Sequence, residues 1–527
     1  MGIQFDSFYQ YEQLSAYLQR IEAEYDQYVN VTTLTQTKEG RNVYVVEVTD
    51  SATGTADSKS AYYIQAGLHA MEGAGVTAAL HVLQSLLSEE LNRDLLKEVA
   101  FYIVPCVDPD GMEYTLTTHA EIRSRYAPTG RKNELIPQDV NGDGYVLQMR
   151  WKDPAGPYKE HPNQPGLMVK REVGDRGEAF YQVVQEGMVW EHDGSRAVHP
   201  IRQEDFNRSY PALWRTDGNS TAYPFSQPEM KAIGDFMLAH PNIFAGVDFH
   251  CGTHAILPTD CKAPHEFPWE DWGSIVQVGK MAERITGLPY TNPADYGFGG
   301  NGSKTYGDSN DWAYMKLGIS HYVVEVGFGL TSLGLSANEI LSSDEKTREE
   351  YVRRLIAMHE ERGNPILTPW EVCDHPQLGE VEIGGMMVGN ARFMDPNDMR
   401  ETAPKTTEFV LKHAAMRPHI IFATAEAVAL GGGLYRIRAD VGNIGGFSTE
   451  VMKGGGGSDM KHPVSIRLIE EGLEVFSRNK IYELQSLAPL GGSIELEWFV
   501  KMDGEQQHIV IEASHPRAGI VRQQVDL

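Results

Sequence analysis

The stretch GLHAMEGAG, which begins at residue 67, places His69 and Glu72 three residues apart, directly after a strand-like run containing YYI. An imidazole and a carboxylate at this spacing have two interpretations. They are a polar turn at the end of a strand, or they are two ligands of one metal ion. The pair alone is compatible with both interpretations, so the choice depends on the residues that accompany it.

His250 has a similar position, because it ends the run GVDFH. Two imidazole nitrogens and one carboxylate form the ligand set of many catalytic zinc sites, in which a fourth position stays open for water. A single histidine at the end of a strand is more often a structural residue. In combination with His69 and Glu72, however, His250 predicts a metal site.

Glu325 lies within the otherwise apolar run VVEVGFG. Burying a glutamate in such a strand costs several kcal/mol unless the side chain is paired or functional. Desolvation also raises the pKa of a carboxyl group, which suits a glutamate to take a proton from water. We therefore expect Glu325 to serve as a general base beside the metal.

Asn207 and Arg208 are adjacent in the run DFNRSYP. Such a pair can hold a carboxylate through charge-assisted hydrogen bonds in a fork-like geometry. Without the other motifs, a surface arginine in a turn would be the commoner case. Together with the candidate metal ligands, the pair indicates a site for an anionic group of the substrate.

The elements that must position these residues alternate between strand and helix over the first part of the chain. This alternation predicts an α/β fold, with a mixed, mostly parallel sheet sandwiched by helices. In such folds ligands bind beyond the carboxyl ends of the strands, where His69, His250 and Glu325 are expected. Ser226 and Glu229 have the spacing of a helix capping box. Strands are expected at 42–49, 62–67, 99–106, 243–250 and 321–328, and helices at 7–28, 76–91, 225–240 and near 272–286.

The remaining chain divides into an insertion and a C-terminal region. Residues 124–204 are rich in Gly, Pro and charge, and we interpret them as a long loop insertion with short strands that covers one face of the site. Short alternating runs with Gly-rich turns near the C-terminus indicate a β-sandwich of immunoglobulin or transthyretin type. The expected division is a catalytic domain at 1–370, a linker at 371–404 and the sandwich at 405–527.

Composition narrows the function classes. The 527 residues carry a formal charge of −27, which argues against nucleic acid or an anionic membrane as a partner. The four cysteines are too few and too scattered for a disulfide framework. No signal peptide and no membrane span is visible. We expect a soluble protein, either cytoplasmic or a secreted or periplasmic form whose leader was removed; the sequence gives no indication of its oligomeric state.

Taken in order, the motifs resemble those of the zinc carboxypeptidase A/B superfamily across most of residues 1–365. The resemblance is carried by GLHAMEGAG, VPCVDPDGMEY, the arginine that follows it, DFNR, VDFH, SNDWAY and VVEVG. It implies one zinc ion held by His69, Glu72 and His250. It also implies that Glu325 is the base and proton shuttle, and that the substrate is a peptide or protein with a free C-terminus.

The resemblance assigns roles to further residues. An arginine after the PDG turn stabilises the oxyanion in this superfamily, and the count from Gly111 reaches Arg123, with Arg125 as the alternative. Asn207 and Arg208 match the pair that holds the terminal carboxylate of the substrate. Asp205 matches the residue that orients a ligand histidine through its other ring nitrogen.

Several positions depart from the family pattern. The mobile tyrosine expected before the DW helix has two candidates, Tyr306 and Tyr296, of which we favour Tyr306. Asn310 occupies the base of the specificity pocket and is neither apolar nor acidic, so the preferred C-terminal side chain stays open.

The insertion contains a stretch, DVNGDGYVLQMR, that is similar to a calcium loop. Asp139, Asn141 and Asp143 have suitable spacing, but Arg150 occupies the twelfth position, where an acidic residue is expected. A Ca²⁺ site and a plain Asx/Gly-rich turn are the alternatives here.

The sequence thus predicts a zinc metallocarboxypeptidase with a C-terminal β-sandwich. One rival is a zinc hydrolase of the same fold that acts on another amide, such as a cell-wall peptide or a modified side chain. Another is a non-catalytic binding protein that keeps the fold. The last is disfavoured, because ligands, base and anion-binding residues all occur together.

Overall fold

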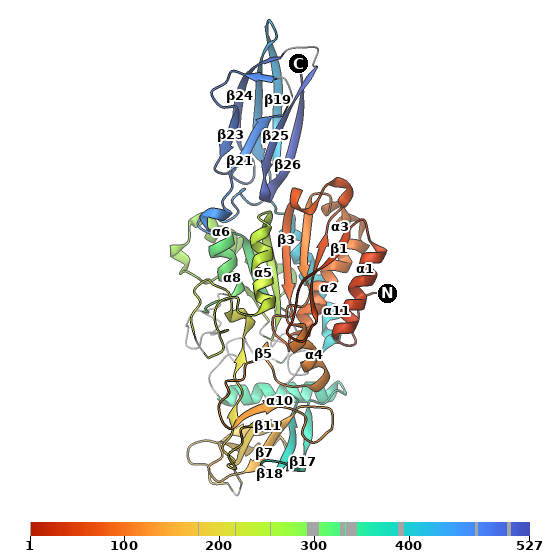
Figure 1. The fold of residues 1–527 in the computed structure, drawn as a ribbon, viewed down its shortest axis with the longest axis vertical. Helices are drawn as coiled ribbons and strands as arrows, with labels where there is room; N and C mark the ends of the chain where they lie inside the picture. The colour runs from red at the N-terminus through yellow and green to blue at the C-terminus, as the bar shows by residue number, and fades with distance from the viewer. Residues whose placement is uncertain are drawn as a thin grey trace.

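The computed structural model describes residues 2–527 except 178, 217, 253, 292–304, 327–332, 334–344, 388–394, 470–472 and 503–506. Three parts follow one another along the long axis of the molecule (Figure 1). An α/β body lies in the middle, a sandwich of C-terminal strands lies at one end, and smaller sheets lie at the other end.

The body contains one mixed sheet, which confirms the expected α/β class. Its central strands β4, β3, β14 and β16 run parallel, and their residues are buried throughout. Burial on both faces explains why these strands read as nearly continuous apolar runs. The antiparallel edges include β1 and β15, which the sequence did not predict. In order across the sheet, the strands are β1 (Val29–Gln36), β2 (Asn42–Val48), β4 (Val99–Val104), β3 (Ser60–Ala66), β14 (Ile243–Cys251), β16 (Ser320–Val326) and β15 (Ile256–Leu257).

Helices cover both faces of this sheet, and each face has its own apolar core. Side chains of β3 alternate between them: Tyr62 packs with α1, α2, α6 and α11, whereas Tyr63 packs with α5 and α8. The helices are α1 (Tyr11–Glu24), α2 (Gly73–Ser88), α3 (Glu90–Leu95), α4 (Pro109–Thr118), α5 (Pro228–Ala239), α6 (Trp269–Thr286), α8 (Ser309–Trp312), α10 (Glu345–Glu361) and α11 (Met399–Ala414).

The start of α5 differs from the predicted capping box. Gln227 is the N-cap and Pro228 is the first helical residue, so Ser226 lies one position too early to cap the helix. Proline is favoured at this position because its fixed φ suits a helix and its missing N–H has no intrahelical partner to lose. Glu229 instead forms an ion pair with Arg125 at 2.8 Å.

The insertion at 124–204 contains short strands, as expected, and the structure pairs them into sheets. Its strands are only two to five residues long, too short for a periodic pattern to identify them. Leu135, Met149 and Trp151 give this region a core of its own. The strands are β5 (Arg125–Tyr126), β6 (Glu134–Pro137), β7 (Gln148–Lys152), β8 (Tyr158–Glu160), β9 (Met168–Lys170), β10 (Tyr181–Gln185), β11 (Gly187–Trp190), β12 (His199–Pro200) and β13 (Gln203–Glu204).

The segment 371–404, expected to be a linker, contains ordered elements. The hairpin β17 (Leu367–His375) and β18 (Gly379–Met386) pairs with β7 and completes the sheet β17-β18-β7-β10-β8-β9. Val381 and Ile383 contribute to the core of the insertion, which explains why this hairpin belongs there. Helix α11 then returns to the body and packs on α2 and α6.

The C-terminal region forms two four-stranded sheets around a core that contains Trp498. Arg517 joins it to the body, because its buried guanidinium donates to the carbonyl of Gly318 at 3.0 Å and its own carbonyl accepts from Ser60 Oγ at 2.8 Å. Ser60 begins β3. The sandwich therefore docks at the amino end of this strand, away from the carboxyl ends that carry the candidate site. The strands are β19 (Ile420–Gly431), β20 (Leu434–Asn443), β21 (Val464–Leu468), β22 (Leu473–Val475), β23 (Ile481–Leu484), β24 (Gly492–Met502), β25 (His508–His515) and β26 (Gly519–Asp526).

Among the described residues, none of the helices combines the length and the apolar composition needed to cross a membrane.

Candidate metal centre

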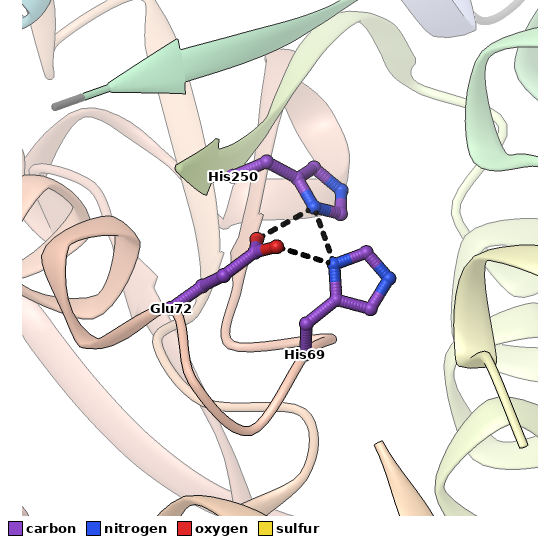
Figure 2. A group of neighbouring side chains, drawn as sticks. All are labelled: His69, Glu72 and His250. Atoms are coloured by element: carbon purple, nitrogen blue, oxygen red, sulfur yellow. Dashed lines mark hydrogen bonds and ion pairs between the residues drawn. The ribbon is translucent and has the colours of Figure 1, made fainter. Parts of the chain in front are cut away.

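His69, Glu72 and His250 converge at the carboxyl ends of β3 and β14 (Figure 2). His69 and Glu72 lie in the turn between β3 and α2, and His250 is the penultimate residue of β14. Nδ1 of His69 lies 2.8 Å from Oε1 of Glu72, and Nδ1 of His250 lies 2.9 Å from Oε2 of the same carboxylate. The two Nδ1 atoms are 3.0 Å apart. All three side chains are buried.

Each imidazole has a carboxylate behind it. Nε2 of His69 lies 3.0 Å from Oδ1 of Asp205, and Nε2 of His250 lies 3.0 Å from Oδ2 of Asp248. A carboxylate at Nε2 favours the tautomer that carries its proton there, which leaves the Nδ1 lone pair facing the centre. Two such lone pairs and a carboxylate that point at one another need a cation between them, so this donor set fits a zinc ion.

Asp248 was not among the predicted site residues, although the sequence carries a signal for it. It precedes His250 by two residues on one strand, and side chains at that spacing share a face of the sheet. Gln65 and Ser309 also donate to its Oδ2, at 2.9 and 2.8 Å. Burial opposes the charge of Asp248, but His250, His321 and the hydrogen bond from Gln65 outweigh it and lower the pKa.

Two glycines allow this turn to form. Gly67 has a φ of +65°, the left-handed region that glycine enters without strain. Gly75 lies in the first turn of α2, and a Cβ at this position would lie 2.6 Å from the carbonyl oxygen of Phe249. Glycine therefore lets α2 approach β14 closely enough for Glu72 to reach His250.

Glu325 lies on β16 beside the metal ligands. It pairs in register with His250 on the adjacent parallel strand, so both side chains point to the same face of the sheet. It is only 7% exposed and lines a cavity together with His69 and His250. Glu325 therefore lies at the same cavity as the two histidine ligands, and its role as a base stays a prediction.

Of the two arginines proposed for the oxyanion, the structure brings Arg123 to this cavity. Its Nη1 donates to Oε1 of Glu72 at 3.1 Å and its Nε donates to Oδ2 of Asp205 at 3.1 Å, while 36% of the side chain stays exposed. Burial opposes its charge, but Asp205, Glu72 and Glu325 outweigh that effect and raise the pKa of Arg123.

Arg125 lies elsewhere, since it begins β5 and does not line this cavity. It pairs with Glu229 at 2.8 Å, Asp110 at 3.3 Å and Asp108 at 3.4 Å, in a buried cluster below the turn. At Asp108, a member of this cluster, the effect of burial exceeds that of the nearby Arg125 and raises the pKa to about 8. Arg125 is therefore assigned a structural role.

Asn207 and Arg208 lie in the short 3₁₀ helix Phe206–Arg208 and line the same cavity. Oδ1 of Asn207 accepts the backbone N–H of Ser309 at 2.9 Å, which leaves its amide NH₂ for a ligand. Arg208 donates to the carbonyl of Asn207 at 2.7 Å. Among the described residues, no carboxylate lies within 4.0 Å of the Arg208 guanidinium.

One wall of the cavity is acidic, which the sequence did not reveal. One oxygen each from Asp260, Asp308 and Asp311 lies within 4.8 Å of the others, and all three side chains are buried. Asp260 and Asp308 line the cavity directly. Burial, together with Asp308 and Asp260, raises the pKa of Asp311 well above its usual value. Asp308 and Asp311 belong to the start of α8, but Asp260 is about fifty residues away, so only the fold joins them.

Asn310 lines the cavity as predicted, but both ends of its amide are occupied. Its Nδ2 donates to the carbonyl of Leu257 at 3.0 Å, and its Oδ1 lies 2.7 Å from Nδ1 of His321. Burial lowers the pKa of His321 to about 4, so that ring is neutral near pH 7 and can donate from Nδ1.

Tyr306, the favoured candidate for the mobile tyrosine, lies outside this centre. The Tyr306 ring packs against Arg215, with the guanidinium carbon 3.5 Å from the ring centroid, and it does not line the cavity. Tyr296 lies outside the described residues.

The predicted calcium loop is an Asx/Gly turn. Asp139 accepts from the backbone of Gly142 and Gly144, at 2.7 and 2.9 Å, and Asp143 accepts from the backbone of Tyr145 at 2.8 Å. Backbone N–H groups thus satisfy both oxygens of Asp139 and one of Asp143, whose other oxygen accepts from the side chain of Asn141 at 3.0 Å. A Ca²⁺ site is not supported.

Ser124 connects the two halves of the centre. Its hydroxyl donates to the carbonyl of Leu68 at 2.7 Å and accepts the backbone N–H of Phe206 at 3.1 Å. It therefore ties the turn that carries His69 to the 3₁₀ helix that carries Arg208. The sequence offered no signal for this residue.

We predict that Ser124→Ala lowers the free energy of unfolding by about 1–3 kcal/mol, because two buried backbone groups lose their partner. Urea denaturation followed by circular dichroism measures the change. Thr117→Ala is the matched control, since its exposed hydroxyl bonds only within α4, to the carbonyls of Glu113 and Tyr114. Equal stability of both variants would contradict the connecting role of Ser124.

Comparison with known proteins agrees with this geometry. The family model described as zinc carboxypeptidase matches residues 14–350, and a model of a domain of unknown function matches residues 419–526. Carboxypeptidase B of Astacus astacus is 22% identical over 357 residues, which cover 65% of this chain and 94% of that protein. Zinc carboxypeptidase A 1 of Drosophila melanogaster is 31% identical over 98 residues, 18% of this chain and 23% of that protein.

Among solved structures, that of thrombin activatable fibrinolysis inhibitor is similar at 16% identity with a TM-score of 0.44, covering 78% of this chain and 74% of that one. Because the family model spans more than half of the chain, including His69, Glu72, His250 and Glu325, the chain belongs to the zinc carboxypeptidase family.

Proposed function

We propose that this protein is a zinc-dependent carboxypeptidase that hydrolyses the C-terminal peptide bond of a peptide or protein. One observation carries the proposal above the others. The two histidine donors, a buried glutamate, and an arginine with no carboxylate partner among the described residues all line one cavity, and Glu72 contacts both histidines from behind it. Each has a separate task in exopeptidase chemistry.

His69, Glu72 and His250 would hold the zinc ion. When bound, zinc supplies a Lewis acid that polarises a carbonyl group and lowers the pKa of water toward neutrality. Asp205 and Asp248 keep both histidines oriented with Nδ1 toward the ion. Carboxylates in this arrangement also raise the basicity of the ligating ring.

Glu325 takes the proton from the attacking water and later gives it to the leaving amine. Its burial suits this task, because it keeps the carboxylate away from bulk water, at the cavity that the two histidine ligands line. The register of β14 and β16 holds it next to His250. The same group therefore serves first as base and then as acid.

Arg123 faces the negative charge that develops on the scissile carbonyl oxygen. Its two ion pairs with Glu72 and Asp205 fix the guanidinium before the substrate arrives. Preorganised donors of this kind lower a barrier because they need no reorganisation during the reaction.

Asn207 and Arg208 hold the terminal carboxylate of the substrate. Charge-assisted hydrogen bonds from a guanidinium and an amide suit a planar carboxylate. A peptide anchored there presents its last peptide bond to the residues around the metal, which accounts for removal of single residues from the end.

We predict that peptides with a free C-terminus are hydrolysed at least about a hundredfold faster, in kcat/KM, than the same peptides with an amidated C-terminus. The estimate corresponds to the loss of one charge-assisted contact of about 3 kcal/mol. Arg208→Ala should remove most of this difference by slowing cleavage of the free peptide. Steady-state kinetics with blocked dipeptides, with and without a chelator, measures both effects.

Two outcomes would contradict parts of this function. Equal cleavage of amidated and free peptides would exclude an exopeptidase and favour hydrolysis of another amide by the same metal centre. Activity that survives complete removal of metal by the chelator would exclude the metal mechanism.

The acidic wall suggests the side chain that this site accepts. Asp260 and Asp308 line the cavity that also contains Arg208 and Asn310. Asn207 is bonded directly to the backbone of Ser309, so the carboxylate anchor and the acidic wall are adjacent. A C-terminal lysine or arginine would place its charge against these carboxylates, whereas an apolar residue would desolvate them at a cost.

Asp308→Asn tests this preference without removing the helix cap. Oδ1 of Asp308 accepts the N–H of Asp311 at 2.9 Å, and asparagine caps a helix as well as aspartate does. We predict that the ratio of kcat/KM for C-terminal arginine to that for C-terminal leucine falls by about tenfold. Kinetics on one peptide series with the two endings gives the ratio. Faster removal of leucine than of arginine by the unmodified protein would contradict the assignment.

A further inference from the structure

A second cavity lies beside the metal centre and is walled by the insertion. Its volume is about 540 Å³, and Arg123 lines both cavities. Its lining includes Arg131 and Glu134, which follow Arg123 in the chain, together with His199 and Arg202, and His199 lies beside Glu134 on the paired strands β12 and β6. Strand β12 pairs with β6, and β13 pairs with β5, so the two ends of the insertion form firm walls.

The lining of this second cavity is cationic, although the whole protein carries a net charge of −27. Glu134 is its one acidic lining residue among those described, and backbone and hydroxyl groups of Thr129 and the backbone of Gly130 donate to its oxygens at 2.9–3.2 Å. That carboxylate is buried and already satisfied. The exposed charge in the cavity therefore comes from the arginines.

Arg131 and Arg202 contribute in different ways. Arg202 is held at the rim, since its Nε donates to the carbonyl of Gly218 at 3.2 Å and its Nη1 lies 3.4 Å from Glu204. Arg131 is exposed, and no carboxylate of the described residues lies within 4.0 Å of its guanidinium. A cationic cleft in an acidic protein concentrates anionic ligands at that cleft.

The position of the cavity indicates which part of a substrate reaches it. In the proposed function, the terminal carboxylate lies at Arg208 and the scissile carbonyl lies near Arg123. Arg208 lines only the first cavity, and Arg123 lines both. The chain that precedes the scissile bond must therefore leave the centre past Arg123, toward the second cavity.

We infer that the second cavity binds acidic side chains of the substrate on the N-terminal side of the scissile bond. This inference rests on the proposed function and adds a substrate class to it, namely peptides with aspartate or glutamate shortly before the residue that is removed. The insertion is then a specificity element, with Arg131 as its principal cation and Arg202 as a fixed part of the wall.

A peptide scan tests the inference. The peptides are six residues long, share one C-terminal residue, and carry either glutamate or glutamine at each of the four positions before the scissile bond. We expect glutamate to raise kcat/KM about fivefold or more at one or two of these positions in low salt. The preference should shrink toward one in 0.5 M NaCl, because screening lengths fall to a few ångströms at such ionic strengths.

Arg131→Gln should reduce the ratio of glutamate to glutamine at those positions to about two or less. Lys132→Gln is the matched control, since it removes a neighbouring exposed charge that does not line the cavity. It should keep the ratio of the unmodified protein. A ratio near one at all four positions, or an equal loss in both variants, would overturn the inference.

Binding separates this inference from the proposed function. Fluorescence anisotropy with labelled peptides and the zinc-loaded Glu325→Gln variant reports affinity without turnover. Tighter binding of the glutamate peptides, lost with added Arg131→Gln, would support the cavity assignment even if no peptide were cleaved. Cleavage of all peptides without any glutamate preference in rate or affinity would leave the exopeptidase function standing and exclude the acidic subsite.

Discussion

Two imidazole nitrogens and a carboxylate meet in a buried space at the ends of β3 and β14, and this arrangement requires balanced charge around it. Asp205 and Asp248 stand behind the histidines, and Arg123 bridges Glu72 and Asp205. Burial opposes the charge of Glu72 and of Asp205, but the two histidines beside Glu72, and Arg123 with His69 beside Asp205, outweigh it and lower both pKa values. The remaining features of the site are built around this network.

The fold brings the network together from distant parts of the chain. Parallel pairing puts His250 and Glu325 side by side, the glycines at 67 and 75 let the preceding turn reach them, and Ser124 ties that turn to the helix that carries Arg208. The two added regions lie at different places relative to this network. The C-terminal sandwich docks at the amino end of β3, whereas the insertion lines the second cavity next to Arg123.

Much of this centre was predictable from the sequence because local order carries the information. The metal ligands and Glu325 lie at the ends of strongly apolar strands, and the sheet brings such ends to one edge. Asp248 was also detectable, two residues before His250. The choice between Arg123 and Arg125 was harder, because it depends on which carboxylates the fold brings to each, Glu72 and Asp205 to Arg123 and Glu229 to Arg125. The acidic wall joins Asp260 to Asp308 across the fold, and no local pattern records that contact. The pairing among the short strands of the insertion, and of the hairpin at 367–386 with β7, also escaped prediction, since these partners are remote in sequence.

The most direct test compares the metal content and the turnover of two variants. Glu325→Gln should retain about one zinc per chain while kcat falls by about a thousandfold, since general base catalysis contributes 10²–10⁴ in rate. His250→Ala should lose the zinc, because it removes one of the three ligands. Elemental analysis of dialysed protein and hydrolysis of a free-carboxylate peptide give both quantities. Loss of zinc from Glu325→Gln, or full turnover by that variant, would contradict the account.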